Sequence, residues 1–304
     1  MGLDMTDANH HDNLKSTRPA ASNSSPSSWW QLPPAIRRVF DRFPLITLPA
    51  NALPQRAPTK RNENVLYIFQ SDDPELRNAP SFNPSCLKWQ AYLKFHGIPL
   101  RTRPSNNHAS PSGVLPFLLP APQDASRPPS PIAANRMAKW VVSQGGKEEA
   151  FHTRQEAYTA LIDHNIRSAW LYYLYLDDEN FRSVASPLYV ASASSSYFVR
   201  LGLARQLRSA AREELRKTNT IIDSEELYQQ ADKAFDALST LLADNIFFFS
   251  QTTPGLFDAS LFAYTQIILD DRLDFHNPTL RLALQRHENL IQHRDRLIRG
   301  FFSG

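Results

Sequence analysis

The chain has 304 residues, of which 42% are hydrophobic and 21% are charged, and its formal net charge at pH 7 is +3. These values indicate a globular protein with a sizeable core, and so small a net charge does not indicate a nucleic-acid binder. The single cysteine, Cys86, excludes an internal disulfide and a multi-cysteine metal site, and a count of only 9 glycines argues against a glycine-rich nucleotide loop.

The composition divides residues 1–62 into two parts. Residues 1–28 are rich in Asn, Ser, Asp and His and poor in large apolar side chains, which predicts a disordered tail. Residues 29–62 combine aromatic, basic and proline residues, and we expect an extended arm that docks on a partner or on its own domain. The side chains predicted to bind a partner are apolar or basic: Trp29, Trp30, Arg37, Arg38, Phe40, Arg42 and Phe43.

Positive charge gathers in residues 1–62, which hold eight Lys and Arg against four Asp. This excess suits an anionic membrane surface or an acidic partner better than a nucleic-acid groove, although a solvated tail has the same composition. The acids Asp4, Asp7 and Asp12 count against a secretory signal or a mitochondrial presequence. The uncharged run Ser183–Val199 holds six serines and lacks the roughly 20 apolar residues of a membrane span, so any membrane link is expected to be peripheral.

The first regular elements are predicted between residues 65 and 103. The apolar run Val65–Phe69 predicts a central strand, covered on both faces. Asn83–Pro84 predicts the N-cap and first position of a helix over Ser85–Phe95, which ends at Gly97. Leu100–Arg103 predicts the second strand.

A proline interrupts the third predicted strand, Val114–Leu119. Because proline cannot donate to a central ladder, Pro116 is expected at an edge or a bulge. A fourth strand is not evident, and either lies in the proline-rich stretch 104–131 or is missing. A helix is predicted over Ile132–Ser143, with Met137, Trp140 and Val141 on one face.

The remaining chain is predicted to be helical. The sequence Thr153-Arg154-Gln155-Glu156 predicts a capping box that opens a helix to about Leu176. The apolar stripe of this helix is predicted at Ala157, Leu161, His164, Ile166, Trp170, Tyr173 and Leu174. Further helices are predicted over Tyr197–Arg216, Asp223–Asp244, Gly255–Leu269 and Asn277–Arg299.

Two segments carry a family resemblance: Phe82–Leu93 (FNPSCLKWQAYL), followed by Gly97 and the Pro116 strand, and Pro254–Tyr264 (PGLFDASLFAY). Together they resemble the metaxin family, whose members have the fold of glutathione transferases. The resemblance covers residues 29–302. With its basic, Trp-containing arm, the chain looks most similar to the smaller, metaxin-2-type subunits of the fungal mitochondrial sorting and assembly machinery.

The resemblance implies an N-terminal thioredoxin-like domain at residues 63–146 and an all-helical C-terminal domain at 150–302. Pro116 would be a cis proline whose neighbouring backbone groups are free to bind an extended ligand. Gly255 takes the place of the hydroxyl residue that caps a buried helix in this fold, and Asp258, three positions on, is expected to bond back onto the first turn. Both residues are therefore interpreted as structural.

The resemblance also implies a role without catalysis and without a cofactor. A family member would support the barrel-forming subunit of the assembly machinery, contact a second metaxin-like subunit and help to recognise β-barrel precursors. It would lie peripherally on the cytosolic face of the mitochondrial outer membrane. One alternative is a cytosolic scaffold of the kind that is fused to translation factors.

A glutathione-dependent transferase that uses Cys86 is the other alternative, because a helix N-terminus lowers a thiol pKa. However, Leu87 replaces the proline that is usual after the cysteine in thiol-type transferases. Pro131-Ile132-Ala133-Ala134 replaces the acidic-Ser pair that holds the γ-glutamyl end of glutathione. We therefore interpret Cys86 as a buried structural residue and expect no catalytic residue.

Two other features have ordinary explanations as well as functional ones. The histidines are scattered without metal-ligand spacing: His108, His152, His164, His276, His287 and His293. The last predicted helix is rich in arginine and ends in Phe301-Phe302, which suits a lipid surface. Arginines near a helix C-terminus also complement the helix dipole, so this pattern does not require a lipid.

Overall fold

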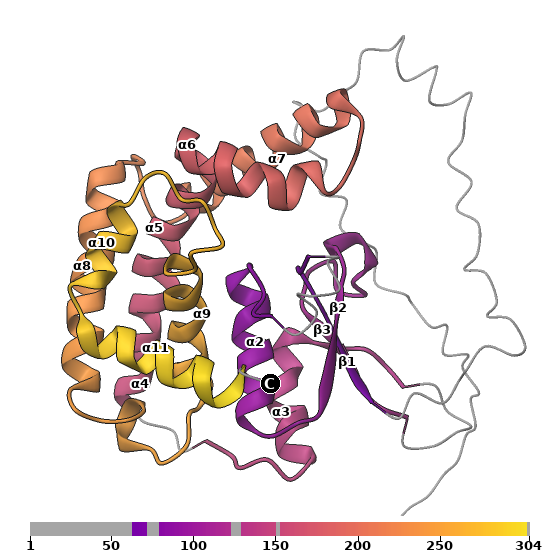
Figure 1. Cartoon of the computed structure of the whole chain (residues 1–304), viewed down its shortest axis with the longest axis vertical. Helices are drawn as coiled ribbons and strands as arrows, with labels where there is room; N and C mark the ends of the chain where they lie inside the picture. Colours follow the sequence, from indigo (N-terminus) through magenta and orange to yellow (C-terminus); the bar gives the residue numbers. More distant parts are fainter. Residues whose placement is uncertain (1–62, 72–78, 123–128, 150–152, 303–304) are drawn as a thin grey trace, which may run out of the picture. The chain divides into compact units, whose positions relative to one another are not determined.

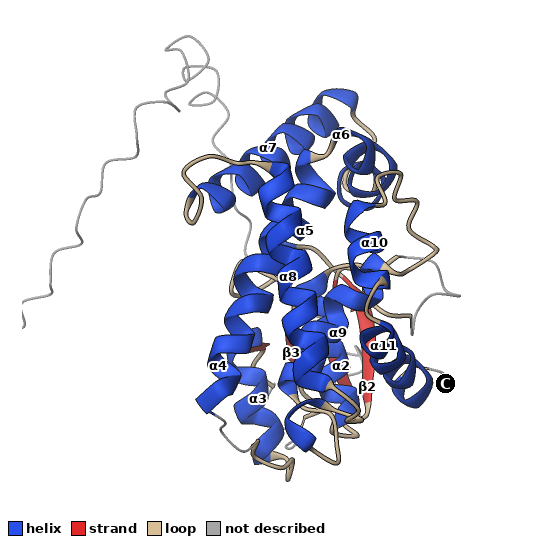
Figure 2. Ribbon diagram, turned by 90° about the vertical axis from the view of Figure 1, so that its left-hand side faces the viewer, coloured by secondary structure: helices blue, strands red, loops and turns tan. Residues whose placement is uncertain are grey.

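The computed structural model describes residues 63–71, 79–122, 129–149 and 153–302. All of them belong to one compact unit, Pro58–Gly304. The predicted tail, residues 1–28, and the predicted arm, residues 29–62, lie outside the described residues. Figure 2 shows that helices make up most of the described chain and that the strands gather in one region.

A small mixed sheet forms the N-terminal half, with strand order β2-β1-β3-β4 in the described residues. Strand β1 (Asn64–Ile68) pairs in parallel with β2 (Leu100–Pro104) and antiparallel with β3 (Phe117–Leu119). Strand β4 (Ile132–Ala133) pairs antiparallel with β3. The fourth strand thus exists, and the predicted helix start at Ile132 was wrong by two residues, because these two residues extend the sheet instead.

Helix α2 (Pro84–Phe95) begins as the sequence predicts. The Asn83 side chain accepts a hydrogen bond from the Cys86 backbone N–H, and Pro84 occupies the first helical position. The chain then turns at Gly97, whose positive φ of 64° favours glycine. Figure 1 shows α2 between the sheet and α9 (Leu256–Ile268), which explains why most of its residues are buried.

The third strand is shorter than the sequence predicts. The Leu115–Pro116 peptide bond is cis, and β3 begins only at Phe117. Val114 is exposed and precedes the strand, because the proline has no N–H to give to the ladder. Pro116 therefore lies at the entrance of an inner strand, and the predicted interruption within the strand was wrong.

Helix α3 (Ala134–Ser143) is followed by a long helical segment over residues 153–176. This segment consists, in order, of α4 (Thr153–Ala160), the π-helical turn η4 (Leu161–Ile166), α5 (Arg167–Leu171) and the π-helical turn η5 (Tyr172–Leu176). Its buried side chains include Ile162, Ile166, Trp170 and Tyr173. Ala157 and His164, predicted on the apolar stripe, are exposed, because the π-helical turns shift the buried face.

The serine-rich stretch is helical, which the sequence did not predict. Helix α6 (Asp178–Asn180) continues into a π-helical segment η6 (Phe181–Ala191) that contains Pro187. Phe181, Val184, Ala185 and Val190 are buried there, so packing outweighs the weak helix propensity of serine and proline. Helix α7 (Tyr197–Arg216) follows with the predicted bounds.

The remaining helices are α8 (Ser224–Leu242), α9, α10 (Thr279–Gln285) and α11 (Glu288–Phe301), with short 3-10 turns at η3 (Asn107–Ala109) and η7 (Phe248–Ser250). The single helix predicted over Asn277–Arg299 is therefore two helices. The break comes at His287, whose ψ of 81° is not helical. This break lets α10 pack against α8 while α11 turns back across α9 and α2.

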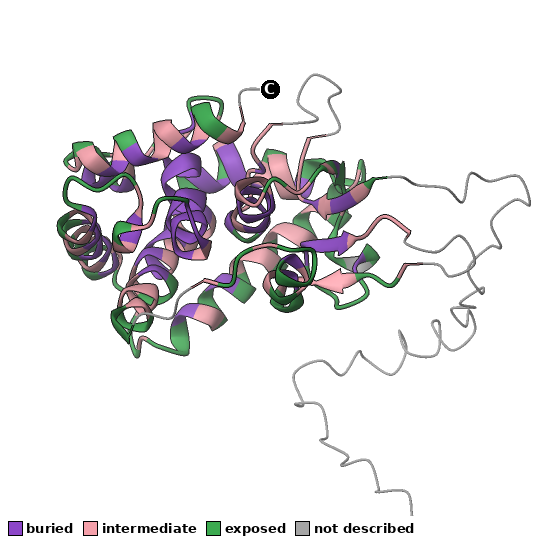
Figure 3. Cartoon of the chain, turned by 90° about the horizontal axis from the view of Figure 1, so that it is seen from below, coloured by how far each residue is buried: buried purple, intermediate pink, exposed green. Residues whose placement is uncertain are grey.

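A continuous core joins the two halves of the described chain. Every residue of α9 from Phe257 to Ile268 is buried, and Figure 3 shows buried residues filling the interior of the helical half. The Phe95 ring of α2 lies 6.4 Å from the Phe262 ring and 4.7 Å from the Phe301 ring. The Phe302 ring lies 5.6 Å from the Phe262 ring, so the two phenylalanines that would also suit a lipid surface pack against the protein. The division into domains at 63–146 and 150–302 stays a prediction.

Candidate functional site

The start of α2 is the place where a transferase of this fold would hold its reactive group, and Cys86 lies in its first turn. The Cys86 side chain is 0% exposed. Its Sγ accepts a hydrogen bond from the Phe69 N–H at 3.5 Å. Burial raises the pKa of the Cys86 thiol to about 12, and the hydrogen bonds from Phe69 and Ser81 only partly offset this effect. The thiol therefore stays protonated at neutral pH and is a poor nucleophile.

An aromatic side chain from the helical half, Tyr189, packs over the N-terminus of α2. The Tyr189 ring of η6 packs edge-on against Phe69 and Phe82, with 5.3 Å between centroids in each case. The Asn83 side-chain amide donates to the Tyr189 hydroxyl at 3.3 Å. Burial raises the pKa of Tyr189 well above its ordinary value, so the hydroxyl is neutral and does not act as a base. Tyr175 lies 6.1 Å away and extends the cluster.

The loop before α2 uses its polar groups internally. The Ser81 hydroxyl donates to the Phe69 carbonyl, and the Ser81 N–H donates to the Gln90 side chain at 2.9 Å. The Gln90 amide in turn donates to the Ala79 carbonyl at 3.0 Å. Because buried polar groups need partners, this network fixes the loop and leaves these groups unable to serve a ligand.

The backbone beside Pro116 is also occupied. The Leu115 N–H, next to the cis bond, donates to the Asn107 side-chain oxygen at 3.0 Å. The family resemblance implied backbone groups beside Pro116 that are free for an extended ligand, and for the Leu115 N–H that expectation was wrong. Asn107 is on a short 3-10 turn after β2, and nothing in the sequence pattern marks it as a partner of Leu115.

A second polar cluster lies at the N-terminus of α9, around Asp258. One carboxylate oxygen accepts from the Gly255 N–H at 3.0 Å, and the other accepts from the Phe248 N–H at 3.1 Å. The Asp258 carboxylate also lies 2.8 Å from Nε2 of the buried His293. Each of these contacts ties one part of the helical half to the first turn of α9, and none of them faces solvent.

Glu149, in the connection between the two halves, completes the start of α9. Its carboxylate accepts from the Leu256 N–H at 2.7 Å. Burial raises the pKa of Glu149, and the hydrogen bond from Leu256 and the nearby His96 charge work in the opposite direction. A Cβ atom at Gly255 would come within 3.0 Å of this carboxylate, which explains why glycine fits there. Sequence reasoning missed Glu149, because its partner is more than a hundred residues away.

Family models match both halves of the chain. One described as "Glutathione S-transferase N-terminal domain" matches residues 84–180, and one described as "Glutathione S-transferase, C-terminal domain" matches residues 231–297. Metaxin-3 of Xenopus laevis is 27% identical over 232 residues, which cover 73% of this chain and 73% of that protein. Metaxin-2 of Homo sapiens is 25% identical and covers 73% of this chain and 83% of its own length.

The chain resembles the metaxin family in sequence. A metaxin-1 homolog of Caenorhabditis briggsae is also 25% identical, over 75% of this chain and 70% of that protein. The predicted glutathione-transferase-like fold is confirmed by the two family models. A solved glutathione transferase, GSTFuA3 from Phanerochaete chrysosporium, is 13% identical, covers 75% of this chain and 97% of its own, and gives a TM-score of 0.47. These metaxins carry three different subtype numbers, and the metaxin-2-type assignment stays a prediction.

The other predicted site features of this metaxin-like chain have separate outcomes. The arm residues Trp29, Trp30, Arg37, Arg38, Phe40, Arg42 and Phe43 lie outside the described residues. Within the described ranges, no group of three or more His, Cys, Asp or Glu side chains could hold a metal ion. Across these same ranges, no helix combines the length and the hydrophobicity of a membrane span.

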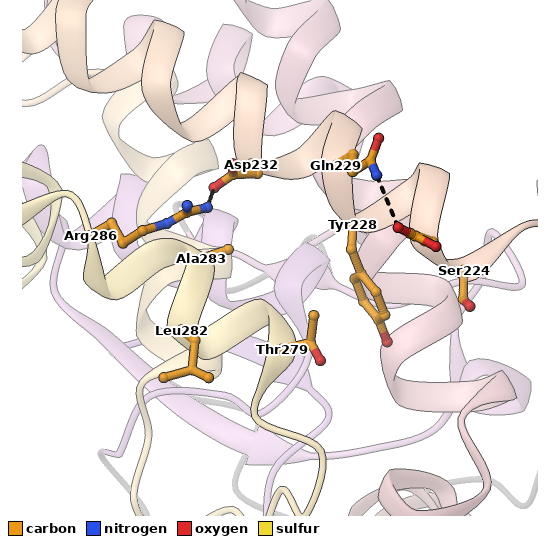
Figure 4. Close-up of a pocket in the computed structure, with 9 residues that line it drawn as sticks. Ser224, Tyr228, Gln229, Asp232, Thr279, Leu282, Ala283 and Arg286 are labelled. Atoms are coloured by element: carbon orange, nitrogen blue, oxygen red, sulfur yellow. Dashed lines mark hydrogen bonds and ion pairs between the residues drawn. The ribbon is translucent and has the colours of Figure 1, made fainter.

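A groove of about 570 Å³ lies between α8 and α10 (Figure 4), away from Cys86. Asp232 and Arg286 form an ion pair across it, and the Gln229 amide donates to Glu225 at 3.3 Å. Leu282 forms an exposed apolar edge. Because Asp232 and Arg286 neutralise each other, the groove resembles an ordinary surface between two helices more than a site for an ionic ligand.

Proposed function

We propose that this chain is a non-enzymatic subunit of the mitochondrial outer-membrane sorting and assembly machinery. It would lie on the cytosolic face, support the barrel-forming subunit, contact a second metaxin-like subunit and help to recognise β-barrel precursors. Sequence similarity to metaxins supports the place of action. The observation that supports the absence of catalysis is the Tyr189 side chain, which packs over the start of α2 and bonds to Asn83.

A thiol-dependent transferase needs an ionised sulfur and an open cleft for the peptide. Burial raises the pKa of Cys86 to about 12, so the thiol is protonated at pH 7. The Leu115 N–H that an extended peptide would use already donates to Asn107. The positions that would hold the γ-glutamyl end are Ile132, Ala133 and Ala134, which offer no side-chain donor or charge. These features together favour a protein-binding role for the fold.

Photo-crosslinking in isolated mitochondria tests the proposal. A photoreactive residue at Trp30 or Phe40 is expected to give adducts with the barrel-forming subunit. The same photoreactive residue at the exposed Ile221 is the control for nonspecific crosslinking. Fractionation of the same cells provides a second readout. Recovery of the chain only in soluble cytosol would contradict the proposal in favour of a cytosolic scaffold.

A turnover assay with glutathione and an electrophilic aromatic substrate tests the enzymatic alternative. We expect the purified chain to show no turnover above the uncatalysed rate, and the Cys86→Ala variant to match it. Thiol-dependent turnover that disappears in Cys86→Ala would show that the chain is an enzyme.

A further inference from the structure

The first two turns of α7 expose a run of apolar side chains that no part of the described chain covers. Tyr197 is 66% exposed, Phe198 82% and Leu201 58%, and Val199 between them is also exposed. The Tyr197 and Phe198 rings contact each other at 5.8 Å, edge to face. An exposed patch with two aromatic residues in a single helical turn marks an interaction surface more often than chance.

The inner face of α7 explains why this patch points outward. Ala211 and Leu215 are buried, and Leu203 and Leu207 pack against the core. Figures 1 and 2 both show α7 at the end of the helical half that is farthest from α4. Phe198, at three residues before Leu201, lies on the side of the helix that the core does not use.

The charged residues that flank the patch along the sequence are all arginines. Residues 183–212 contain arginine at positions 200, 205, 208 and 212 and no Asp or Glu. Arg208 is used internally, because it pairs with Asp178 and lies 5.2 Å over the Phe181 ring. Arg205 and Arg212 are exposed, and among the described residues neither forms an ion pair. Arg205 follows Phe198 by two helical turns, so the apolar end continues into a basic stripe.

We propose that the first turns of α7 bind an anionic lipid surface. Tyr197, Phe198 and Leu201 would enter the headgroup region, and Arg205 and Arg212, on the same side of the helix, would contact lipid phosphates. Apolar side chains beside arginines are the pattern of an interfacial helix, and tyrosine prefers the boundary between lipid and water. The inference rests on the proposed function, which puts the chain at a membrane, and it moves the lipid contact from the C-terminal phenylalanines to α7.

Vesicle co-sedimentation of the purified full chain tests this contact. We expect binding to phosphatidylcholine vesicles that contain phosphatidylserine, little binding to phosphatidylcholine alone, and weaker binding as salt rises. The double variant Tyr197→Ser/Phe198→Ser is expected to lower the partition coefficient about tenfold, and Arg205→Gln/Arg212→Gln to lower it by a similar factor. All four residues lie on the surface, and circular dichroism checks that the variants fold.

The control is Ile221→Ser/Leu282→Ser, which removes two exposed apolar side chains elsewhere and is expected to bind like the wild type. Equal binding by the α7 variants and the wild type overturns the inference. So does binding that is lost only in Trp29→Ser/Trp30→Ser, which would place the lipid contact on the arm. If the α7 variants bind vesicles normally but lose a protein that co-purifies from mitochondria, the patch is a protein interface.

This assay uses no mitochondrial partner, so it can fail independently of the proposed function. A chain that crosslinks to the barrel-forming subunit but ignores vesicles keeps its proposed function and loses this inference. A chain that binds vesicles through α7 but gives no crosslink keeps the inference and loses the proposed function.

Discussion

At the scale of single residues, the start of α2 combines a buried thiol with a tyrosine from another part of the chain. The Cys86 sulfur accepts a hydrogen bond from the Phe69 backbone N–H, and the Tyr189 ring packs against the Phe69 ring. Burial of the sulfur disfavours its ionised form, and the Tyr189 ring takes up room that a substrate would need.

We expect Tyr189→Ala to open this site. In the wild type, an aromatic disulfide reagent should react with Cys86 at least about 100-fold more slowly than in urea, because only a buried neutral thiol is present. The variant should react about tenfold faster than the wild type in native buffer, and its free energy of unfolding should fall by about 2–4 kcal/mol. The matched control is Tyr197→Ala, which removes an exposed tyrosine. Equal labelling rates in all three proteins would show that Tyr189 does not cover the thiol.

Sequence reasoning predicted features whose signals are local. The cap at Asn83, the proline at position 84 and the turn at Gly97 come from residues within a few positions of each other. Tyr189 bonds to Asn83, more than a hundred residues away, and Asn107 bonds to Leu115 across a loop, and the residues next to them in the sequence do not indicate either contact. The start of α2 was therefore located correctly, but what covers it was not.

At the scale of elements, the wrongly predicted segments are those whose local sequence pattern does not match the structure they form. The two-residue strand β4 is too short to show alternation, and it forms because β3 offers a free edge. Segment η6 contains Pro187 and several serines, which normally indicate a loop, yet its buried side chains hold it in a helical conformation. The break between α10 and α11 contains no glycine or proline, so the sequence does not indicate it.

Glu149 and the N-terminus of α9 give a prediction at this scale. Burial raises the pKa of Glu149, so the folded chain keeps a proton at pH values where the unfolded chain has lost it. The stability from this group is therefore complete below the ordinary glutamate pKa and is lost as pH rises through the higher, folded value. Glu149→Gln is neutral at every pH, so the stability of this variant relative to the wild type should increase as pH rises.

Urea unfolding between about pH 4 and pH 8 measures this difference, over a range that begins near the ordinary glutamate pKa. The control is Glu148→Gln, which changes the exposed neighbour and should follow the wild type throughout. If the curves of the two variants run parallel, burial does not raise the pKa of Glu149.

At the scale of the whole described unit, α9 is the common wall of both halves. Phe262 contacts Phe95 of the N-terminal half and Phe302 after α11, and Lys94 places its ammonium 4.8 Å over the Phe302 ring. The Lys94 ammonium also donates to the Phe301 carbonyl at 3.0 Å. Such an interface links the two halves more tightly than a flexible connection would.

We expect Phe262→Ala to weaken both halves together. Loss of this buried ring should lower the free energy of unfolding by about 3–5 kcal/mol. Hydrogen exchange followed by mass spectrometry should show faster exchange in peptides from both α2 and α9. Leu282→Ala, which removes an exposed apolar side chain, should change neither. Faster exchange confined to one half would show that the halves unfold independently.

The close approach of Gly255 to Glu149 has a consequence for how related chains vary. Both a hydroxyl side chain at position 255 and a carboxylate at position 149 can accept hydrogen bonds from the first turn of α9, but a Cβ at 255 would come within 3.0 Å of that carboxylate. A side chain at 255 therefore requires the carboxylate at 149 to move by a few tenths of an ångström, away from its bond to the first turn. We expect homologues with serine or threonine at 255 to carry an acid at 149 less often than homologues with glycine, so that the two positions vary together.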